Sequence, residues 1–170
     1  KINYKPEIDF LRAIAVTSVI IYHANINFLG YKILPGGYLG VDIFFVISGY
    51  LISAIILNKI EDKNFSFKDF YLRRARRILP ALLVMIILIF PIAWLILLPS
   101  SLIDFSNSII FSLGFSSNYY FYFTGLEYGA KSGLLKPLLH TWSLGVDEQF
   151  YLIFPLILIG GIFLFKKKIV

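Results

Sequence analysis

Apolar runs long enough to cross a lipid bilayer recur along this sequence, and they restrict the folds that the chain can adopt. A helix needs about 20 mostly apolar residues, each rising ~1.5 Å, to span the hydrocarbon core of a bilayer. With 58% hydrophobic and 15% charged residues, the chain carries more apolar surface than a 170-residue globule can bury in its own core. Lipid must cover the rest, so the sequence predicts an all-α fold, a polytopic transmembrane helical bundle.

Four apolar runs are clear candidates for membrane spans, and a fifth run is ambiguous. The ambiguous run, at about 103–123, is interrupted by Asp104, by several Ser and Asn residues and by aromatic residues that suit a membrane interface. Because the chain begins without Met and ends just after a span, we expect it to be part of a longer protein. The clear spans are expected at about 8–29, 38–57, 78–98 and 144–165.

The basic residues cluster beside the apolar runs. Seven of the sixteen Lys and Arg residues lie between Lys59 and Arg77, and three more, Lys166, Lys167 and Lys168, follow the last span. Such clusters are typical of cytoplasmic segments that face anionic lipid. We therefore predict a cytoplasmic basic loop at 59–77, a lipid bilayer as partner and no nucleic-acid partner, despite the net charge of +6.

The orientation of the last span depends on the ambiguous run. The basic loop at 59–77 places the N-terminus inside the cell and the turn around Pro35 outside. If the terminal lysines are also cytoplasmic, residues 100–125 lie in the outer interface or re-enter it. If residues 100–125 cross the membrane, the lysines lie outside. The charge rule favours the first arrangement.

His23 and Arg12 are ionisable residues inside the first predicted span. Burying such groups in a bilayer costs several kcal/mol of free energy unless they are paired or solvated. They lie eleven residues apart, which at ~100° per residue leaves only about 20° between them around the helix axis. This shared face suits a catalyst with a base in the outer half of the bilayer and a cation near the cytoplasmic end. Alternatively, Arg12 reaches the inner headgroups and His23 hydrogen-bonds a neighbouring helix. Asp9 can pair with Arg12 or be an ordinary first-turn acid.

The second span begins with Asp42, which is a candidate for substrate binding or an exposed acid at the end of a span. Ser48 and Gly49 lie in the middle of this span, where small residues favour close helix packing over catalysis.

Four arginines form a cluster between the second and third spans. The planar fork of an arginine suits phosphate, so a phosphate-rich donor such as coenzyme A would fit this cluster. Anchoring of a cytoplasmic segment to lipid explains it equally well. The cluster consists of Arg73, Arg74, Arg76 and Arg77.

A polar segment, residues 140–151, leads into the last span. If it is helical, Glu148 and Tyr151 lie one turn apart, and Glu148 enters the apolar run. A buried Glu can shuttle protons or hold sugar hydroxyls, whereas interfacial solvation explains Asp147 better than it explains Glu148. His140, Trp142 and Tyr151 are candidates for substrate binding or for a structural role.

Four motifs in register carry a resemblance to a known family. Together they resemble the acyltransferase 3 family, the membrane O-acetylases of the lipopolysaccharide and peptidoglycan type. The match covers nearly the whole chain. The motifs are the residues 4–15 with 22–24, 36–50, 70–80 and 138–151.

The resemblance implies a bacterial inner-membrane enzyme of about ten helices, which would move an acyl group, usually acetyl, from a coenzyme A thioester to hydroxyls of a surface glycan such as O-antigen or peptidoglycan. In the family pattern, Arg12 and His23 match an Arg and a His, Arg73 to Arg77 match a paired-arginine motif, and Glu148 matches a Glu before Gln-Phe-Tyr. Tyr50 and Asp147 depart mildly from the pattern. The opening residues and residues 135–140 are most similar to members with a C-terminal SGNH-type domain, which would lie outside this chain along with the remaining helices.

These observations give a catalytic hypothesis in which His23 is the general base and Arg12 and the arginine cluster hold the phosphates of the donor. Glu148 would orient His23 or the sugar. The expected partners are an acyl-CoA donor substrate and a glycan acceptor. No bound cofactor and no metal is expected, and the absence of Cys excludes thiolate ligands. The rival classes are a transporter or flippase and a non-catalytic membrane subunit.

Overall fold

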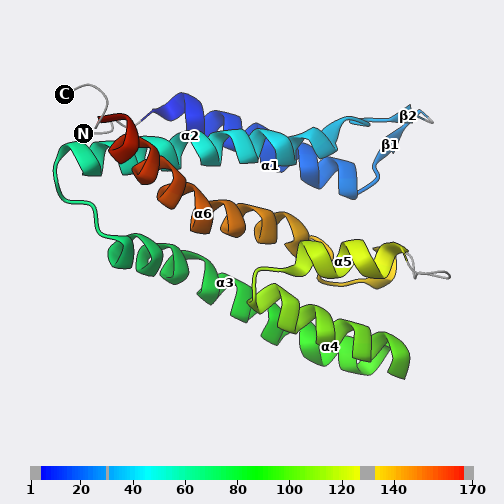
Figure 1. The fold of residues 1–170 in the computed structure, drawn as a ribbon. Coiled ribbons are helices and arrows are strands. Elements are labelled where there is room, and N and C mark those ends of the chain that lie inside the picture. The colour runs from blue at the N-terminus through cyan, green and yellow to red at the C-terminus, as the bar shows by residue number, and fades with distance from the viewer. Residues whose placement is uncertain (1–4, 30, 127–132, 167–170) are drawn as a thin grey trace. The chain divides into compact units, whose positions relative to one another are not determined.

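The computed structural model describes residues 5–29, 31–126 and 133–166. Tyr4 of the first motif and Lys167 and Lys168 of the terminal cluster therefore lie outside the described residues. The chain divides into two compact units, Lys1–Phe65 and Ser66–Val170. The described part is helical except for one very short hairpin and the connecting turns, which confirms the all-α fold class (Figure 1).

The first unit is a pair of packed helices joined by the hairpin. α1 spans Pro6–His23 and begins with a proline in its first turn, where the N–H that proline lacks has no partner inside the helix. The strands β1 (Asn27–Phe28) and β2 (Tyr31–Lys32) pair antiparallel, and a single 3₁₀ turn, η1 (Gly37–Leu39), leads into α2 (Gly40–Glu61).

Two glycines allow α2 to approach the backbone of α1. A Cβ atom on Gly37 would collide with the carbonyl oxygen of Ser18, and one on Gly40 would collide with that of Ala15. Ala15 is completely buried by this contact, which is the small-residue packing that is common between membrane helices.

The second unit holds four helices around a common apolar core. α3 spans Phe67–Ile96, α4 Pro99–Leu113, α5 Ser117–Leu126 and α6 Thr141–Lys166, with a short 3₁₀ turn η2 (Gly133–Leu135) before α6. Residues of α3, α4, α5 and the turn before α6 form the buried apolar cluster of this unit: Leu82, Ile86, Ala93, Phe105, Phe121 and Leu138.

The ambiguous fifth run forms two short helices, not one. α4 has 15 residues and α5 has 10, so neither is long enough by itself to span about 30 Å of hydrocarbon. The chain turns between them at Phe115, whose φ is 51°. The N–H of Ser116 donates to the carbonyl of Phe111 at 2.8 Å, which closes α4 with the usual left-handed terminating turn. Whether residues 100–125 re-enter the outer interface stays a prediction.

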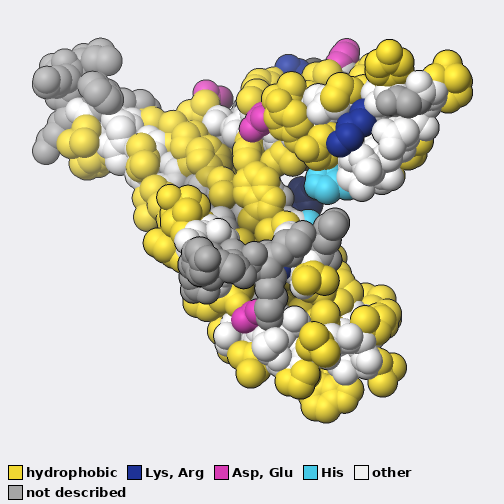
Figure 2. All heavy atoms as spheres, turned by 90° about the vertical axis from the view of Figure 1, so that its right-hand side faces the viewer, with side chains coloured by type: hydrophobic (Ala, Val, Ile, Leu, Met, Phe, Trp, Pro, Cys, Tyr) yellow, Lys and Arg dark blue, Asp and Glu magenta, His cyan; other side chains and the backbone are white. Residues whose placement is uncertain are grey.

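Among the described residues, three helices are long and apolar enough to cross a membrane: Gly37–Glu61, Phe67–Ile96 and Thr141–Leu164. Hydrophobic side chains dominate the face shown in Figure 2, and residues such as Leu95 and Val46 are 84% and 73% exposed. A surface of this kind requires a lipid covering, so the chain is a membrane protein. α1 ends at His23, short of the predicted end of the first span at residue 29.

The basic segment at 59–77 is not the loop that the sequence suggested. α2 continues to Glu61 and α3 begins at Phe67, so only residues 62–66 lie outside the helices. Arg and Lys have high helix propensity, and the hydroxyl of Ser66 caps α3 by accepting a hydrogen bond from the N–H of Asp69 at 3.3 Å. The arginine cluster therefore lies on the first turns of α3.

Candidate functional site

His23 is the last residue of α1, and its ring orientation is set by its own helix. Its Nδ1 lies 2.9 Å from the carbonyl oxygen of Val19. A carbonyl can only accept, so Nδ1 carries the proton and Nε2 of the neutral ring is left as an acceptor. This is the tautomer that a general base needs. The side chain is exposed on the surface of its unit.

Two tyrosine rings lie at this end of α1. The Tyr22 ring lies edge-on to the His23 ring at 5.2 Å and to the Tyr38 ring at 5.6 Å. Tyr38 follows Gly37, so the close approach of η1 to α1 brings this ring into place.

Arg12 lies on the same side of α1 as His23, because the helix is unbroken between them. Its Nη1 lies 3.7 Å from Oδ1 of Asp9, and the two side chains are 35% and 51% exposed. The geometry therefore shows the Arg12–Asp9 pair that the sequence offered as one alternative. Such an exposed ion pair contributes little to the stability of the fold. Its main effect is that Asp9 orients the guanidinium group of Arg12.

The other residues predicted in α2 have different surroundings. Asp42 is an exposed acid in the first turn of the helix. Ser48 and Gly49 are half-buried, and the carbonyl of Gly49 accepts a hydrogen bond from the hydroxyl of Ser53 at 2.7 Å. This hydrogen bond lies within α2, so the packing role that the sequence favoured for Ser48 and Gly49 stays a prediction.

A contact between Lys5 and Tyr50 was missed by sequence reasoning. Nζ of Lys5 donates to the Tyr50 hydroxyl at 2.7 Å and lies 5.2 Å from the ring centroid, and this hydrogen bond raises the pKa of Lys5. The pair lies beside a cavity of about 590 Å³ whose apolar lining includes Ile8, Leu11 and Ile47. Tyr50 is one of the two positions at which the chain departs from the family pattern, and this departure is the one signal that could have drawn attention to it.

In the second unit, a group of polar side chains joins α3 to α6. The guanidinium carbon of Arg74 lies 3.5 Å from the centroid of the Tyr151 ring, and Arg74 interacts electrostatically with both Asp147 and Glu148. Glu148 is only 7% exposed. One turn before Arg74, the Tyr71 hydroxyl donates to the carbonyl of Leu152 at 2.9 Å.

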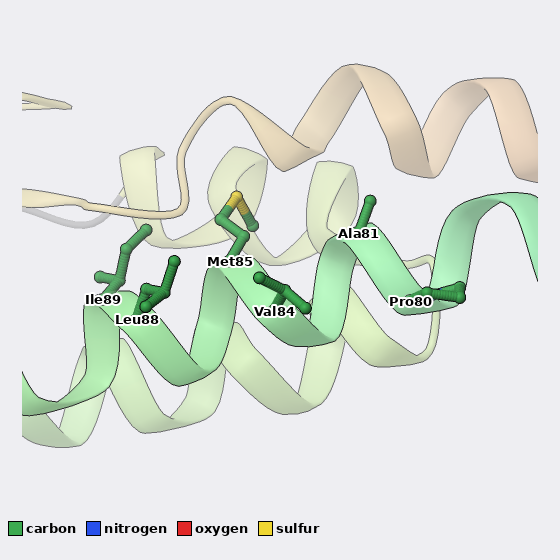
Figure 3. A pocket seen from close by; sticks show the side chains of 6 residues that line it. All are labelled: Pro80, Ala81, Val84, Met85, Leu88 and Ile89. Atoms are coloured by element: carbon green, nitrogen blue, oxygen red, sulfur yellow. The ribbon is translucent and has the colours of Figure 1, made fainter.

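His140 and Trp142 lie where the chain enters α6. Nε2 of His140 lies 3.1 Å from the sulfur of Met85 on α3, and Trp142 is 39% exposed. Met85 also lines an open groove of about 580 Å³ on the surface of α3 (Figure 3). Every side chain that lines this groove is apolar: Pro80, Ala81, Val84, Met85, Leu88 and Ile89.

A second polar network, which sequence reasoning did not single out, fixes the turn between α4 and α5 against α6. Nε2 of Gln149 donates to the carbonyl of Phe115 and to Oδ1 of Asn118, both at 2.8 Å. The hydroxyls of Ser112 and Thr141 pair at 2.8 Å. Gln149 and Thr141 lie in the polar segment 140–151, but nothing in the sequence indicated their partners.

The structure thus brings Arg74, Glu148 and Tyr151 together, and it places His23 and Arg12 on one helix face. His23 and Glu148 belong to different units, so the orientation of His23 by Glu148 stays a prediction, as do the catalytic and donor-binding roles. Within the described residues, no group of three His, Cys, Asp or Glu residues is arranged to hold a metal ion.

Comparisons with known proteins cover almost all of the chain. A family model described as an acyltransferase domain matches residues 5–169. The protein named "Putative peptidoglycan O-acetyltransferase YrhL" from Bacillus subtilis is 43% identical over 168 residues, which are 98% of this chain and 25% of that protein. "Peptidoglycan O-acetyltransferase OatA" from Listeria monocytogenes is 43% identical over 158 residues, which are 92% of this chain and 24% of that protein. The chain thus spans about a quarter of the length of these relatives. No solved structure matches it.

Proposed function

Because this chain belongs to the acyltransferase 3 family, we propose that the full-length protein is a membrane-bound O-acetyltransferase of the bacterial cell membrane. Its acceptor would be a hydroxyl of peptidoglycan, since two similar relatives carry that substrate in their names. The proposal thus selects peptidoglycan from the two acceptors that the sequence left open, O-antigen and peptidoglycan.

The proposed donor is acetyl-CoA, bound from the cytoplasmic side. Arg73, Arg76 and Arg77 are exposed on the first turns of α3, where their guanidinium groups can reach phosphates. The remaining helices, and the SGNH-type domain that the resemblance implies, would belong to the parts of the full-length protein beyond this chain.

The observation that carries the proposal is the hydrogen bond from Nδ1 of His23 to Val19. With Nδ1 protonated, Nε2 can take the proton of an acceptor hydroxyl as the hydroxyl oxygen attacks the acetyl carbonyl carbon. A new C–O bond forms, the C–S bond of the thioester breaks, and coenzyme A leaves as its thiolate, which then takes a proton. The hydroxyl can belong to the glycan itself or to a carrier that passes the acetyl group on.

Substitution of His23 tests this role in the full-length protein. His23→Gln keeps a polar side chain of similar length but cannot act as a base, and we expect peptidoglycan O-acetylation to fall by at least ~100-fold. Thr17→Ala changes an exposed residue of the same helix and serves as the matched control. Mass spectrometry of muropeptides gives the readout, and immunoblotting of membranes confirms equal insertion. Normal acetylation in the His23→Gln strain would remove His23 as the base.

A further inference from the structure

The four arginines on α3 have different surroundings. Arg73, Arg76 and Arg77 are exposed, whereas Arg74 is half-buried against α6. Arg73 and Arg77 lie four residues apart and are therefore neighbours on one side of the helix, while Arg74 is rotated by ~100° from Arg73. A single role for the whole cluster does not fit this arrangement.

Arg74 lies against an aromatic ring of α6 and interacts electrostatically with two acids of the same helix. A guanidinium whose central carbon lies 3.5 Å from the Tyr151 ring centroid has one planar face covered by that ring. A side-chain hydrogen bond also joins Tyr151 to Asp147, so the ring that covers Arg74 is itself fixed by one of the acids.

Charge compensation explains why the arginine is needed there. Glu148 is 7% exposed, and a buried carboxylate without a positive neighbour is strongly destabilising. Arg74 is the positive group that acts most strongly on both Asp147 and Glu148, and Arg77 acts on Glu148 to a smaller extent. Removing the positive charge of Arg74 would leave two neighbouring acids facing apolar surroundings.

The first turns of α3 thus meet α6 through side chains at two successive levels. Tyr71 contacts the carbonyl of Leu152 at one level, and Arg74 covers the Tyr151 ring at the next. Together these contacts fix the rotation of α3 about its own axis, and this rotation decides which arginines are exposed.

We propose that Arg74 is a positioning residue that locks α3 to Glu148 and Tyr151 on α6, and that Arg73 and Arg77 are the pair that contacts the donor. This inference rests on the proposed function for the identity of the donor. It assigns Glu148 to the interhelical lock, in place of a contact with the sugar or with His23.

Steady-state kinetics of the full-length protein in lipid nanodiscs separate the two roles. With acetyl-CoA as the varied substrate, Arg73→Gln and Arg77→Gln should each raise KM by about tenfold, because each removes a charge-assisted contact with phosphate. Arg74→Gln should lower kcat by about tenfold or more and leave KM for acetyl-CoA within about twofold. Arg74→Lys, which keeps the charge but not the planar face, should recover part of kcat. Lys68→Gln removes an exposed charge from the same helix and is the control. A rise in KM for Arg74→Gln that equals the rise for Arg77→Gln would overturn the proposal.

A double-mutant cycle on unfolding tests the lock without any activity. Arg74→Gln and Glu148→Gln should each lower the unfolding temperature of the full-length protein, and the double variant should lose clearly less than the sum, because neither charge is then left unpaired. Additive losses would overturn the lock. If the wild-type protein transfers no acetyl group from acetyl-CoA, the proposed function fails, and the cycle still decides whether Arg74 and Glu148 are coupled.

Discussion

Gly40 at the start of α2 lies against the main-chain carbonyl of Ala15 in the middle of α1. A Cβ atom on Gly40 would collide with that oxygen and would lie 2.8 Å from Cγ2 of Val19. We therefore expect Gly40→Ala to force the two helices apart and to lower the free energy of unfolding of the full-length protein by about 1–3 kcal/mol or more, the usual cost of overpacking. Thermal unfolding in detergent measures this loss.

Gly160 in α6 supplies the control for this substitution. A Cβ atom there would meet nothing within 4 Å, so Gly160→Ala should be neutral or should gain up to about 1 kcal/mol from the better helix propensity of Ala. Equal unfolding temperatures for Gly40→Ala and the wild type would contradict the close approach of the two helices.

Gln149→Glu should destabilise the second unit. The amide N–H groups of Gln149 donate hydrogen bonds to the carbonyl of Phe115 and to Oδ1 of Asn118. A carboxylate at this position has no N–H to donate and would place its oxygens against these two acceptors. We expect a loss of about 1–3 kcal/mol in the free energy of unfolding. Asn107→Asp makes the same amide-to-acid change at an exposed site of α4 and should change little. An equal effect of the two substitutions would show that Gln149 is not the residue that fixes the turn between α4 and α5.

Tyr50→Phe should make Lys5 lose its proton at a lower pH. The hydrogen bond to the Tyr50 hydroxyl raises the pKa of Lys5 above its ordinary value of 10.5. A raised pKa means that the contact stabilises the protonated form, so this stabilisation is present below the ordinary value and is lost as the pH rises through the higher value of the folded state. At neutral pH the substitution should not change the charge of Lys5.

Amine labelling followed by mass spectrometry detects this change. Between about pH 9 and 11, Lys5 should react more readily in Tyr50→Phe than in the wild-type protein, because more of it is unprotonated. Lys32, exposed in the same unit, should react equally in both. Identical Lys5 profiles would refute the hydrogen bond.

The helical fold class and the sharing of a helix face by polar residues were the parts of the structure that the sequence could predict. The all-α class follows from the apolar runs, and the same-side placement of Arg12 and His23 follows from periodicity once α1 is an unbroken helix. Residue spacing predicts which side chains share one face of a helix, but it does not predict which residues of other helices or segments contact that face. The contacts of Arg74 with Tyr151 and of Lys5 with Tyr50 join residues far apart in the chain, and no local pattern encodes them.

The basic segment shows a second limit of pattern reading. Polarity suggested a loop at 59–77, but charged residues form helices readily, and short capping residues set the boundaries. Ser66 is the N-cap of α3, and Lys63, two residues after the end of α2, has a φ of 53°. A cap of one or two residues is a weaker sequence signal than seven basic residues within a segment of nineteen, although it is the cap that sets the helix boundary.

Lys63→Gly should stabilise the protein. Lys63 occupies the left-handed position of a complete Schellman motif, in which its N–H donates to the carbonyl of Ile60 at 3.0 Å and the N–H of Asn64 donates to that of Lys59 at 2.9 Å. A side chain in this conformation costs about 1–2 kcal/mol that glycine avoids, and the greater entropy of glycine in the unfolded chain offsets part of the gain. We expect a net gain of roughly 0.5–1 kcal/mol in the free energy of unfolding. Lys63→Ala removes the same charge and side chain but keeps Cβ, so it should show no such gain. A gain of equal size in both variants would assign the effect to the lost charge and not to the backbone conformation at residue 63.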